Sequence, residues 1–410
     1  MNRRRLILFL TTVGPGIIIS AADNDAGGIT TYAVAGASYG YEMLWVVLFA
    51  SLFLAVVQEM CARMGAVTGK GLSDLIRENF GVRWTTFAML TLFIANVAVT
   101  MAEFAGIAAA LEIFGISRYI SVPLSAVALW VLLIRGSYHY VEKVFLVLAL
   151  SLVGYLIAGY LVGPDWNAVI AGTVVPSVRF EPGFLLLTVA LIGTTITPWM
   201  QFVLQSSVVD KGVTVQEYKY TRLDIYLGAF YTFIVCYFIV ITAGATLHPA
   251  GIAVQDAAQV AISLAPMAGQ YAEVLFAIGL LGVSLMAGSI LPLSTAYAIC
   301  EAFGLERGVS YSISDAPVFY LVYTALIALG AGAILIPGLP LVQVMLFSQD
   351  VNGILITVVL IFILLLVNNR RLMGRYVNGP WYNLVAWGST AIIIAFTGML
   401  LVSSILGMGS

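Results

Sequence analysis

Charged side chains are scarce in this sequence, and their scarcity excludes a soluble globular protein. Asp, Glu, Lys and Arg together make up 9% of the 410 residues, whereas hydrophobic residues make up 61% and the mean hydropathy is +1.03. Soluble domains typically carry about 25% charged residues. The composition therefore predicts an integral membrane protein, without a soluble domain that could hold an enzyme active site or bind nucleic acid.

Cysteine and histidine are also rare, and neither residue type has the spacing of a metal-ligand cluster. Cys61, Cys236 and Cys300 are scattered through apolar segments, which predicts buried free thiols and no disulfide framework. The two histidines, His139 and His248, fall in or near predicted loops. These two residue types therefore indicate no metal site.

Apolar runs close to the roughly 20-residue length of a membrane-spanning helix recur about eleven times. No convincing cleavage site follows the first run, so it is interpreted as a membrane helix and not as a signal peptide. The sequence predicts an all-α integral membrane protein with one transmembrane domain over residues 1–410. The expected helices are 6–37, 43–67, 84–111, 119–135, 141–163, 184–208, 222–246, 271–301, 317–336, 340–367 and 382–407.

Positive charge alternates between the loops that connect these spans. Arg3, Arg4 and Arg5 precede the first span, and Lys or Arg residues follow spans two, four, six, eight and ten, whereas the loop 247–270 has none. Cytoplasmic loops of membrane proteins carry the excess of Lys and Arg. The pattern predicts a cytoplasmic N-terminus and an external C-terminus in the inner membrane of a prokaryotic cell.

The first expected span is interrupted by the stretch Asp23-Asn24-Asp25-Ala26-Gly27-Gly28. A carboxylate at bilayer depth costs a few kcal/mol or more, so acids there usually have a partner or a function. Each glycine weakens the helix by roughly 0.8–1 kcal/mol relative to alanine. A broken helix leaves backbone carbonyls without intrahelical partners, which is tolerated only beside a cavity or within protein. Acids beside free carbonyls predict a cation site.

A second interruption lies in the sixth span, where Gly193 and Pro198 bracket Thr194-Thr195-Ile196-Thr197. Proline inside a helix removes one hydrogen bond and crowds the preceding turn. A proline kink with a glycine packing contact is the simpler alternative for either break alone. Interrupted helices at corresponding places in two halves are typical of inverted-repeat transporters, which predicts a five-plus-five repeat with broken helices 1 and 6. The expected parts are a first repeat at 1–163, a second repeat at 184–368 and an extra helix at 382–407.

Three further groups of polar residues lie within apolar spans. They are Asn96, Thr100 and Glu103; Thr197, Gln201 and Gln205; and Ser348, Gln349, Asp350 and Asn352. The first two groups are spaced for one face of a helix. Neutral polar residues in membranes commonly form hydrogen bonds between helices, whereas Glu103 and Asp350 indicate a function or a partner. Glu59 and Arg63, at i and i+4, predict a structural ion pair.

The side chains and backbone at the two breaks offer carboxylate, hydroxyl, carboxamide and carbonyl oxygens. Met200 follows Pro198 but is expected to point to a different face from Thr197. Oxygen ligands suit hard cations such as Mg²⁺, Ca²⁺ and Mn²⁺. Mg²⁺ keeps several waters and needs only one or two carboxylates. Because Gly27, Gly28 and Thr197 are small, they leave room for a hydrated ion, and hydrated Mg²⁺ is the expected cargo.

At these residues the chain resembles the Nramp family of divalent-metal transporters. The similarity extends over most of the length and includes Gly14-Pro15-Gly16 at the first span, Val67-Thr68-Gly69-Lys70 after the second and Ala102-Glu103 in the third. The resemblance implies the broken-helix fold shared with amino-acid/sodium symporters. It also implies that the metal ion is the transported substrate, so that no cofactor is expected.

The sequence departs from the family at three places. The family's Asp-Pro-Gly-Asn reads Asp25-Ala26-Gly27-Gly28 here, and its Met-Pro-His reads Thr197-Pro198-Trp199. The family's Asp-x-x-Glu reads Thr100-Met101-Ala102-Glu103, so one proton-path acid is missing. These departures resemble the Nramp-related magnesium transporter branch, whose known members carry Mg²⁺ and Mn²⁺ without evident proton coupling.

We therefore expect a monomeric importer of hydrated Mg²⁺, and also of Mn²⁺, that works in the lipid bilayer by alternating access without proton coupling. The expected ion ligands are Asp25, Thr197 and the backbone around Gly28 and Thr194. The residues expected to hold the ion's waters or to line the pathway are Asp23, Asn24, Gln201, Gln205, Gln349, Asp350, Asn352, Thr100, Glu103 and Trp199.

Two other transport functions remain open. A proton-coupled Mn²⁺ or Fe²⁺ importer of ordinary Nramp type is disfavoured by Gly28, Thr197 and Trp199. A sodium/organic-solute symporter on the same fold is disfavoured because an acid in the first break would repel an anionic carboxylate substrate. A membrane enzyme or a channel finds no supporting motif, since neither a nucleophile–base pair nor a selectivity-filter sequence is present.

Overall fold

Helices are the regular elements in the part of the chain that the computed structural model describes, which is residues 24–134, 154–309 and 311–405. Eight helical segments within those ranges are long and apolar enough to cross a membrane. The prediction of an all-α membrane fold is therefore confirmed. The helices are α3 (Ala26–Tyr39), α4 (Leu44–Thr68), α5 (Leu72–Glu112), α6 (Arg118–Ile134), α8 (Gly154–Leu161), α9 (Trp166–Val174), α10 (Pro182–Thr195), α11 (Pro198–Asp210), α12 (Tyr218–Thr246), α13 (Ala257–Ile262), α14 (Ala265–Ala268), η2 (Gly269–Tyr271), α15 (Ala272–Phe303), α16 (Pro317–Ile334), α17 (Leu341–Val367), α18 (Arg370–Met373), η3 (Gly374–Tyr376) and α19 (Pro380–Ile405).

Most expected spans match a helix closely, because long apolar runs fix where a helix is buried. The expected span 84–111 is the exception, since α5 begins earlier, at Leu72. The added segment carries Asp74, Arg77 and Glu78, whose charges hide it from a search for apolar runs. It joins the span at Gly81, whose φ of 78° is a left-handed conformation that glycine adopts readily.

Two expected spans are described only in part. The first is described from residue 24 and contributes α3, so Asp23 lies outside the described residues. The fifth, expected at 141–163, contributes α8, and the preceding residues with His139 lie outside the described ranges. The division into repeats at 1–163 and 184–368 stays a prediction.

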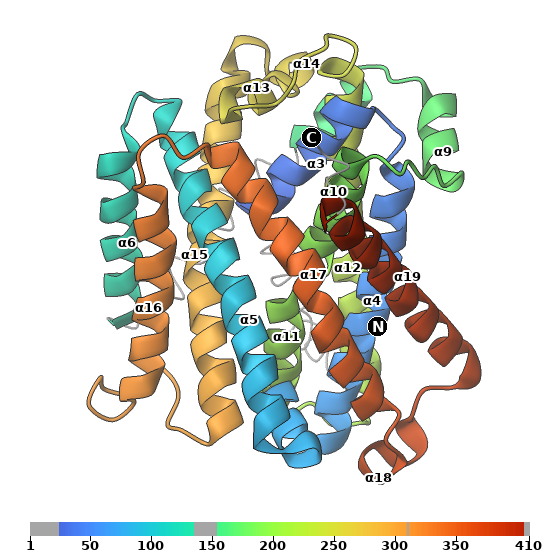
Figure 1. Cartoon of the computed structure of the whole chain (residues 1–410), viewed down its shortest axis with the longest axis vertical. Helices are drawn as coiled ribbons and strands as arrows, with labels where there is room; N and C mark the ends of the chain where they lie inside the picture. Colours follow the sequence, from blue (N-terminus) through green and yellow to red (C-terminus); the bar gives the residue numbers. More distant parts are fainter. Residues whose placement is uncertain (1–23, 135–153, 310, 406–410) are drawn as a thin grey trace, which may run out of the picture.

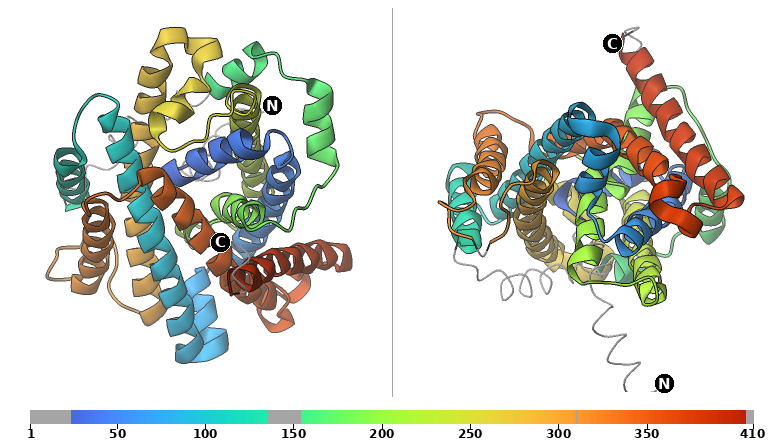
Figure 2. Two further views of the ribbon diagram at one scale, coloured as in Figure 1. Left: turned by 45° about the horizontal axis from the view of Figure 1, so that its top comes forward. Right: turned by 90° about the horizontal axis from the view of Figure 1, so that it is seen from below.

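The long helix α5 packs against both α15 and α17, and α16 lies with α6 at one side of the bundle (Figure 1). The helices α3 and α10 lie at the end of the bundle that carries α13 and α14, whereas α11 lies toward the end that carries α18 (Figure 1). Two further views place α19 at the periphery (Figure 2). The helices α3, α10 and α11 therefore lie in the interior, and most of their residues are buried.

The closest helix contact beside the breaks joins α10 to α17. A Cβ atom at Gly193 would overlap the backbone of Gln349 and Gly353, and one at Gly353 would overlap the Val189 carbonyl. Only glycine permits two helix backbones to approach this closely. This contact fixes the position of the Gln349 main chain beside the end of α10.

Two structural predictions are confirmed. The Glu59 and Arg63 side chains form an ion pair of 3.2 Å within α4. Arg63 also donates a hydrogen bond of 2.7 Å to the Tyr376 carbonyl. This bond connects α4 to the segment before α19. All three cysteines are buried, and no disulfide bond joins any two of them.

Candidate cation site

Asp25 is the N-cap of α3, at the first break. Its backbone is extended (φ −75°, ψ 175°), and its Oδ1 accepts a 2.6 Å hydrogen bond from the Gly28 backbone N–H. Aspartate is a preferred N-cap because it accepts from the N–H groups that a helix start leaves unpaired. The other oxygen, Oδ2, is buried and has no hydrogen-bond partner among the described residues. One carboxylate oxygen thus starts the helix, and the other remains available to a ligand.

The second break separates α10, which ends at Thr195, from α11, which begins at Pro198. Because proline has no N–H, the helix cannot continue with a hydrogen bond from residue 198 to the Thr194 carbonyl. Ile196 and Thr197 have non-helical backbone angles. The hydroxyls of Thr194 and Thr197 are buried and have no partner among the described residues. This break therefore presents hydroxyl and carbonyl oxygens in the protein interior.

Gln349 of α17 brings the two breaks together. Its backbone carbonyl lies against Gly193, the residue before Thr194, and its side chain lies against Gly27 of α3. The carboxamide also lies within reach of the Asp25 carboxylate. A Cβ atom at Gly27 would overlap the Gln349 amide nitrogen, so a larger residue there would displace the Gln349 carboxamide.

Glu103 of α5 is the second acid at the first break. Its Oε2 lies 3.5 Å from the backbone nitrogen of Ala26, and its Oε1 is buried and has no partner among the described residues. The side chain is fully buried. Asp25 and Glu103 are therefore two buried carboxylates at the start of α3, in a low-dielectric interior that strengthens their attraction for a cation.

A direct hydrogen bond also joins the two broken helices. The Tyr32 hydroxyl of α3 lies 2.7 Å from the Thr195 hydroxyl at the end of α10. Thr195 in turn donates to the Leu191 carbonyl. Sequence reasoning missed this contact because the two residues are 163 positions apart and neither belongs to a recognisable motif.

The Cys236 thiol of α12 is a second contact that the sequence did not indicate. Its sulfur donates to the Asn24 side-chain oxygen at 3.3 Å, next to Asp25. The thiol therefore holds Asn24 at the edge of the break. Within the described ranges, His, Cys, Asp and Glu form no group of three or more that could hold a metal ion. Binding by these residues must rely on one or two carboxylates and on neutral oxygens.

Other expected pathway residues lie at varied places. Gln201 donates to the Thr197 carbonyl at 3.4 Å, inside the second break. Gln205 donates to the Lys70 carbonyl at 2.9 Å, beyond the end of α4 and away from both breaks. Trp199 is buried in the first turn of α11, and within the described structure its indole nitrogen has no partner.

The three polar residues expected to share one face of α5 contact three different helices. The Asn96 amide donates to Thr295 of α15 at 2.5 Å, and Thr100 packs against Gly330 of α16. Only Glu103 reaches the first break. Asp350 of α17 is buried, and its Oδ1 has no partner in the described ranges.

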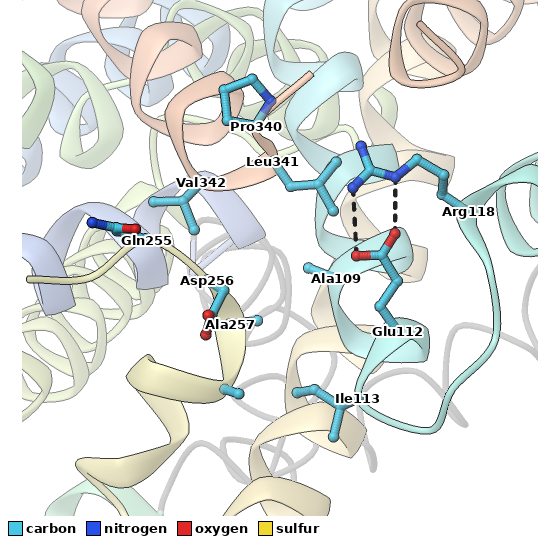
Figure 3. Close-up of a pocket in the computed structure, with 11 residues that line it drawn as sticks. Ala109, Glu112, Ile113, Arg118, Gln255, Asp256, Ala257, Pro340, Leu341 and Val342 are labelled. Atoms are coloured by element: carbon cyan, nitrogen blue, oxygen red, sulfur yellow. Dashed lines mark hydrogen bonds and ion pairs between the residues drawn. The ribbon is translucent and has the colours of Figure 1, made fainter. Parts of the chain in front are cut away.

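A pocket of about 300 Å³ lies outside the breaks, at the end of the bundle that carries α13 (Figure 3). Its two acids are already engaged: Glu112 pairs with Arg118 at 2.8 Å, and Asp256 accepts from the Gln259 N–H at the start of α13. Arg118 also donates to the Leu339 carbonyl. The pocket is therefore a structural junction between α5 and α17.

A larger cavity of about 420 Å³ lies between α11 and α15. Its lining begins at Phe202, about one turn after the second break, and is mostly apolar. The polar side chains among the lining residues are Ser206, Ser207, Asp210, Ser294 and Tyr297.

A helix that begins at the buried Asp25 carboxylate lies beside a span broken between Thr195 and Pro198, inside a helical membrane bundle. This arrangement is typical of transporters of the broken-helix class. Solved structures agree with this fold. A manganese transporter of Eremococcus coleocola superposes with a TM-score of 0.78 at 19% identity, covering 98% of this chain and 88% of that one. MhsT in complex with L-phenylalanine superposes with a TM-score of 0.59 at 14% identity, covering 95% and 98%.

The family described as natural resistance-associated macrophage protein-like, Nramp, matches residues 16–403, and the chain belongs to this family. Two curated relatives are named divalent metal cation transporter MntH. The protein of Klebsiella pneumoniae is 27% identical over 407 residues, covering 97% of this chain and 95% of the relative. The protein of Deinococcus radiodurans is 28% identical over 418 residues, covering 97% and 90%. The resemblance to the Nramp family drawn from the sequence motifs is confirmed, and the resemblance to its magnesium branch stays a prediction.

Tyr32→Phe is expected to weaken the link between the two broken helices. The change removes one buried hydrogen bond, so the free energy of unfolding should fall by about 1 kcal/mol. Thermal unfolding of Tyr32→Phe, Thr195→Val and the double variant in detergent measures the coupling. Each single variant already removes the hydrogen bond between the two side chains. The double variant should therefore lower the free energy of unfolding by less than the sum of the two single variants. Strict additivity would contradict the assignment.

Proposed function

We propose that this protein imports a hydrated divalent cation, Mg²⁺ ahead of Mn²⁺, by alternating access and without proton coupling. Transport of divalent metal cations is the function for which the curated relatives are named, and it comes to this chain through membership of the family. The preference for Mg²⁺ and the absence of coupling are the finer parts of the proposal.

The observation that carries the proposal is the free oxygen of Asp25 in an oxygen-rich interior. Asp25 Oδ2 and the hydroxyls of Thr194 and Thr197 are buried without partners in the described structure. Such oxygens suit a hard cation, and Mg²⁺ requires few protein ligands because it retains water. Gly28 has no side chain that could bind the ion, and its backbone N–H donates to Asp25. A water molecule of the hydrated ion can therefore occupy the place of a side-chain ligand at this position.

Membrane potential alone is a sufficient driving force for import. A charge crossing 100 mV gains about 2.3 kcal/mol, so a divalent ion gains about 4.6 kcal/mol. At 1.4 kcal/mol per decade, this supports a concentration ratio of about two thousand. Accumulation therefore needs no proton gradient.

We also propose a cytoplasmic N-terminus and an external C-terminus in the prokaryotic inner membrane. The alternation of Lys and Arg between loops supports this orientation. It makes the cavity between α11 and α15 the cytoplasmic exit. A monomer is the proposed functional unit, because all the side chains proposed to contact the ion come from a single chain.

Uptake by proteoliposomes tests the proposal. Mg²⁺, Mn²⁺ and Ca²⁺ are offered in turn under a negative internal potential, with a pH indicator and an ion indicator inside. We expect Mg²⁺ and Mn²⁺ uptake without internal acidification beyond that of protein-free vesicles. Metal-driven acidification above that leak would favour the runner-up, a proton-coupled Mn²⁺ or Fe²⁺ importer of ordinary Nramp type.

Gly28→Asn combined with Thr197→Met is expected to shift selectivity toward Mn²⁺. The two changes add a carboxamide and a soft thioether, and the thioether favours transition metals over Mg²⁺. We expect the Mn²⁺-to-Mg²⁺ ratio of uptake rates to rise by roughly tenfold, which is about 1.4 kcal/mol of discrimination. Competition of Mn²⁺ uptake by millimolar Mg²⁺ measures the shift, with Thr197→Ser as the control that keeps the hydroxyl. An unchanged ratio would remove both positions from the site.

A further inference from the structure

We propose that Asn352 is the positioning residue that decides which end of the Gln349 carboxamide faces the first break. We further infer that this amide pair reverses its orientation when the cation binds. The inference rests on the proposed transport function, because the cation is the cargo of that function. The side-chain hydrogen bond of Asn352 in the described structure is to Gln349, and Asn352 acts through that residue.

The two amides form one hydrogen bond on α17. Asn352 Nδ2 donates to Gln349 Oε1 at 3.0 Å, and both side chains are fully buried. The residues are three positions apart, so they share one face of the helix. The Gln349 oxygen is therefore held toward Asn352, and its NH₂ group faces Gly27 and the Asp25 carboxylate.

This orientation suits a site without a cation. An amide NH₂ group can donate to a carboxylate but not to a cation. Gln349 Nε2 and Asp25 Oδ2 are both buried and have no hydrogen-bond partner in the described structure. A cation is ligated by the amide oxygen and repels the NH₂ group. If Gln349 is to face a bound ion, its carboxamide must therefore turn by about half a revolution.

Asn352 can satisfy the turned amide. Its Oδ1 is buried and has no partner in the described ranges, so it can accept from the Gln349 NH₂ group once that group faces away from the break. The pair thus exchanges one hydrogen bond for another. The main chain of Gln349 is held by Gly193, so rotation about the last side-chain bond, which has a broad two-fold profile, is the movement available.

Substitutions at Asn352 separate the two orientations. Asn352→Asp offers only acceptors and should hold the Gln349 NH₂ group, which leaves the Gln349 oxygen toward the cation. Asn352→Leu offers nothing and should release Gln349. For Mg²⁺ uptake by proteoliposomes we expect the KM to fall by roughly fivefold in Asn352→Asp with a lower kcat, and to rise by roughly fivefold in Asn352→Leu, as for one hydrogen bond.

The same Asn352 substitutions are also made in the Gln349→Ala variant, to test whether Asn352 acts through the Gln349 carboxamide. Without the carboxamide, Asn352→Leu and Asn352→Asp should change the KM by less than about twofold, because neither has a partner to orient. A fall in KM that persists in Gln349→Ala Asn352→Asp would mean that the added charge acts directly on the ion and would overturn the inference. Equal effects in both backgrounds would mean simple packing and would also overturn it.

The controls keep this test separate from the proposed function. Asn368→Asp places the same acid at the far end of α17, where the Asn368 amide bonds the Leu364 carbonyl, and should leave the KM unchanged. If Asn352→Leu fails to fold, Asn352→Asp and its Gln349→Ala partner still decide the question. Absence of Mg²⁺ and Mn²⁺ uptake by the unmodified protein would overturn the transport proposal; uptake with an unchanged KM in the Asn352 variants would overturn only the inference.

Discussion

Asp25→Asn should reduce Mg²⁺ uptake by at least about 100-fold while leaving the protein folded. Asparagine is as good an N-cap as aspartate, so its side-chain oxygen still accepts from Gly28 and α3 still begins at Ala26. What disappears is the negative charge beside the cation. A divalent ion about 4 Å from a unit charge gains about 8 kcal/mol at an effective dielectric constant of 20, before desolvation is subtracted.

A 100-fold loss corresponds to about 2.8 kcal/mol, so it requires only a third of that attraction to survive desolvation. Proteoliposome flux and thermal unfolding, measured on the same preparation, separate loss of binding from loss of fold. Asp25→Glu keeps the charge but moves it by one methylene, and its loss should be smaller. Uptake by Asp25→Asn at the rate of the unmodified protein would remove Asp25 from the site.

Gly193→Ala should both destabilise the protein and abolish transport. The new methyl group meets the Gln349 carbonyl oxygen and the Gly353 backbone, and neither can move aside without separating α10 from α17. Overpacking of this kind costs typically 1–3 kcal/mol. The separation also moves Thr194 and Gln349, which lie on either side of the contact.

Thermal unfolding in detergent and Mg²⁺ uptake measure the two effects. Gly332→Ala in α16 is the matched control, because a methyl group there meets no atom within 4 Å. Its stability should be unchanged or higher, since alanine favours a helix by up to about 1 kcal/mol over glycine. If Gly193→Ala and Gly332→Ala behaved alike, the close approach of α10 and α17 would have no energetic importance.

The helices could be predicted largely from the sequence, because burial in lipid requires long apolar runs that can be counted directly. The expected span 317–336 is observed as α16, Pro317–Ile334. The predicted start of a helix was wrong where charged residues precede the apolar run, as in α5. Residues 72–83 lay outside the expected spans, but the segment is helical from Leu72 up to Gly81.

The sequence could predict which residues interrupt a helix, but not which residues of other helices contact them. Asp25 and Thr197 stood out because acids, glycines and proline interrupt an apolar run, which is a local signal. The partners of these breaks come from distant helices: Gln349 against Gly27, and Cys236 on Asn24. No local pattern encodes which helix faces which, so these contacts required the structure. The roles of Asp25 and Thr197 as ion ligands stay a prediction.

Under the proposed function, the hydrogen bond from the Gly28 N–H makes one carboxylate, that of Asp25, serve both the backbone and the cargo. A cation that withdraws electron density from Asp25 weakens the acceptor that starts α3, and a force that unwinds the first turn of α3 changes the affinity for the cation. Thermodynamic linkage makes these two effects equal in free energy. Binding of the cation and unwinding of the first turn of α3 are therefore coupled, so a change in one shifts the equilibrium of the other.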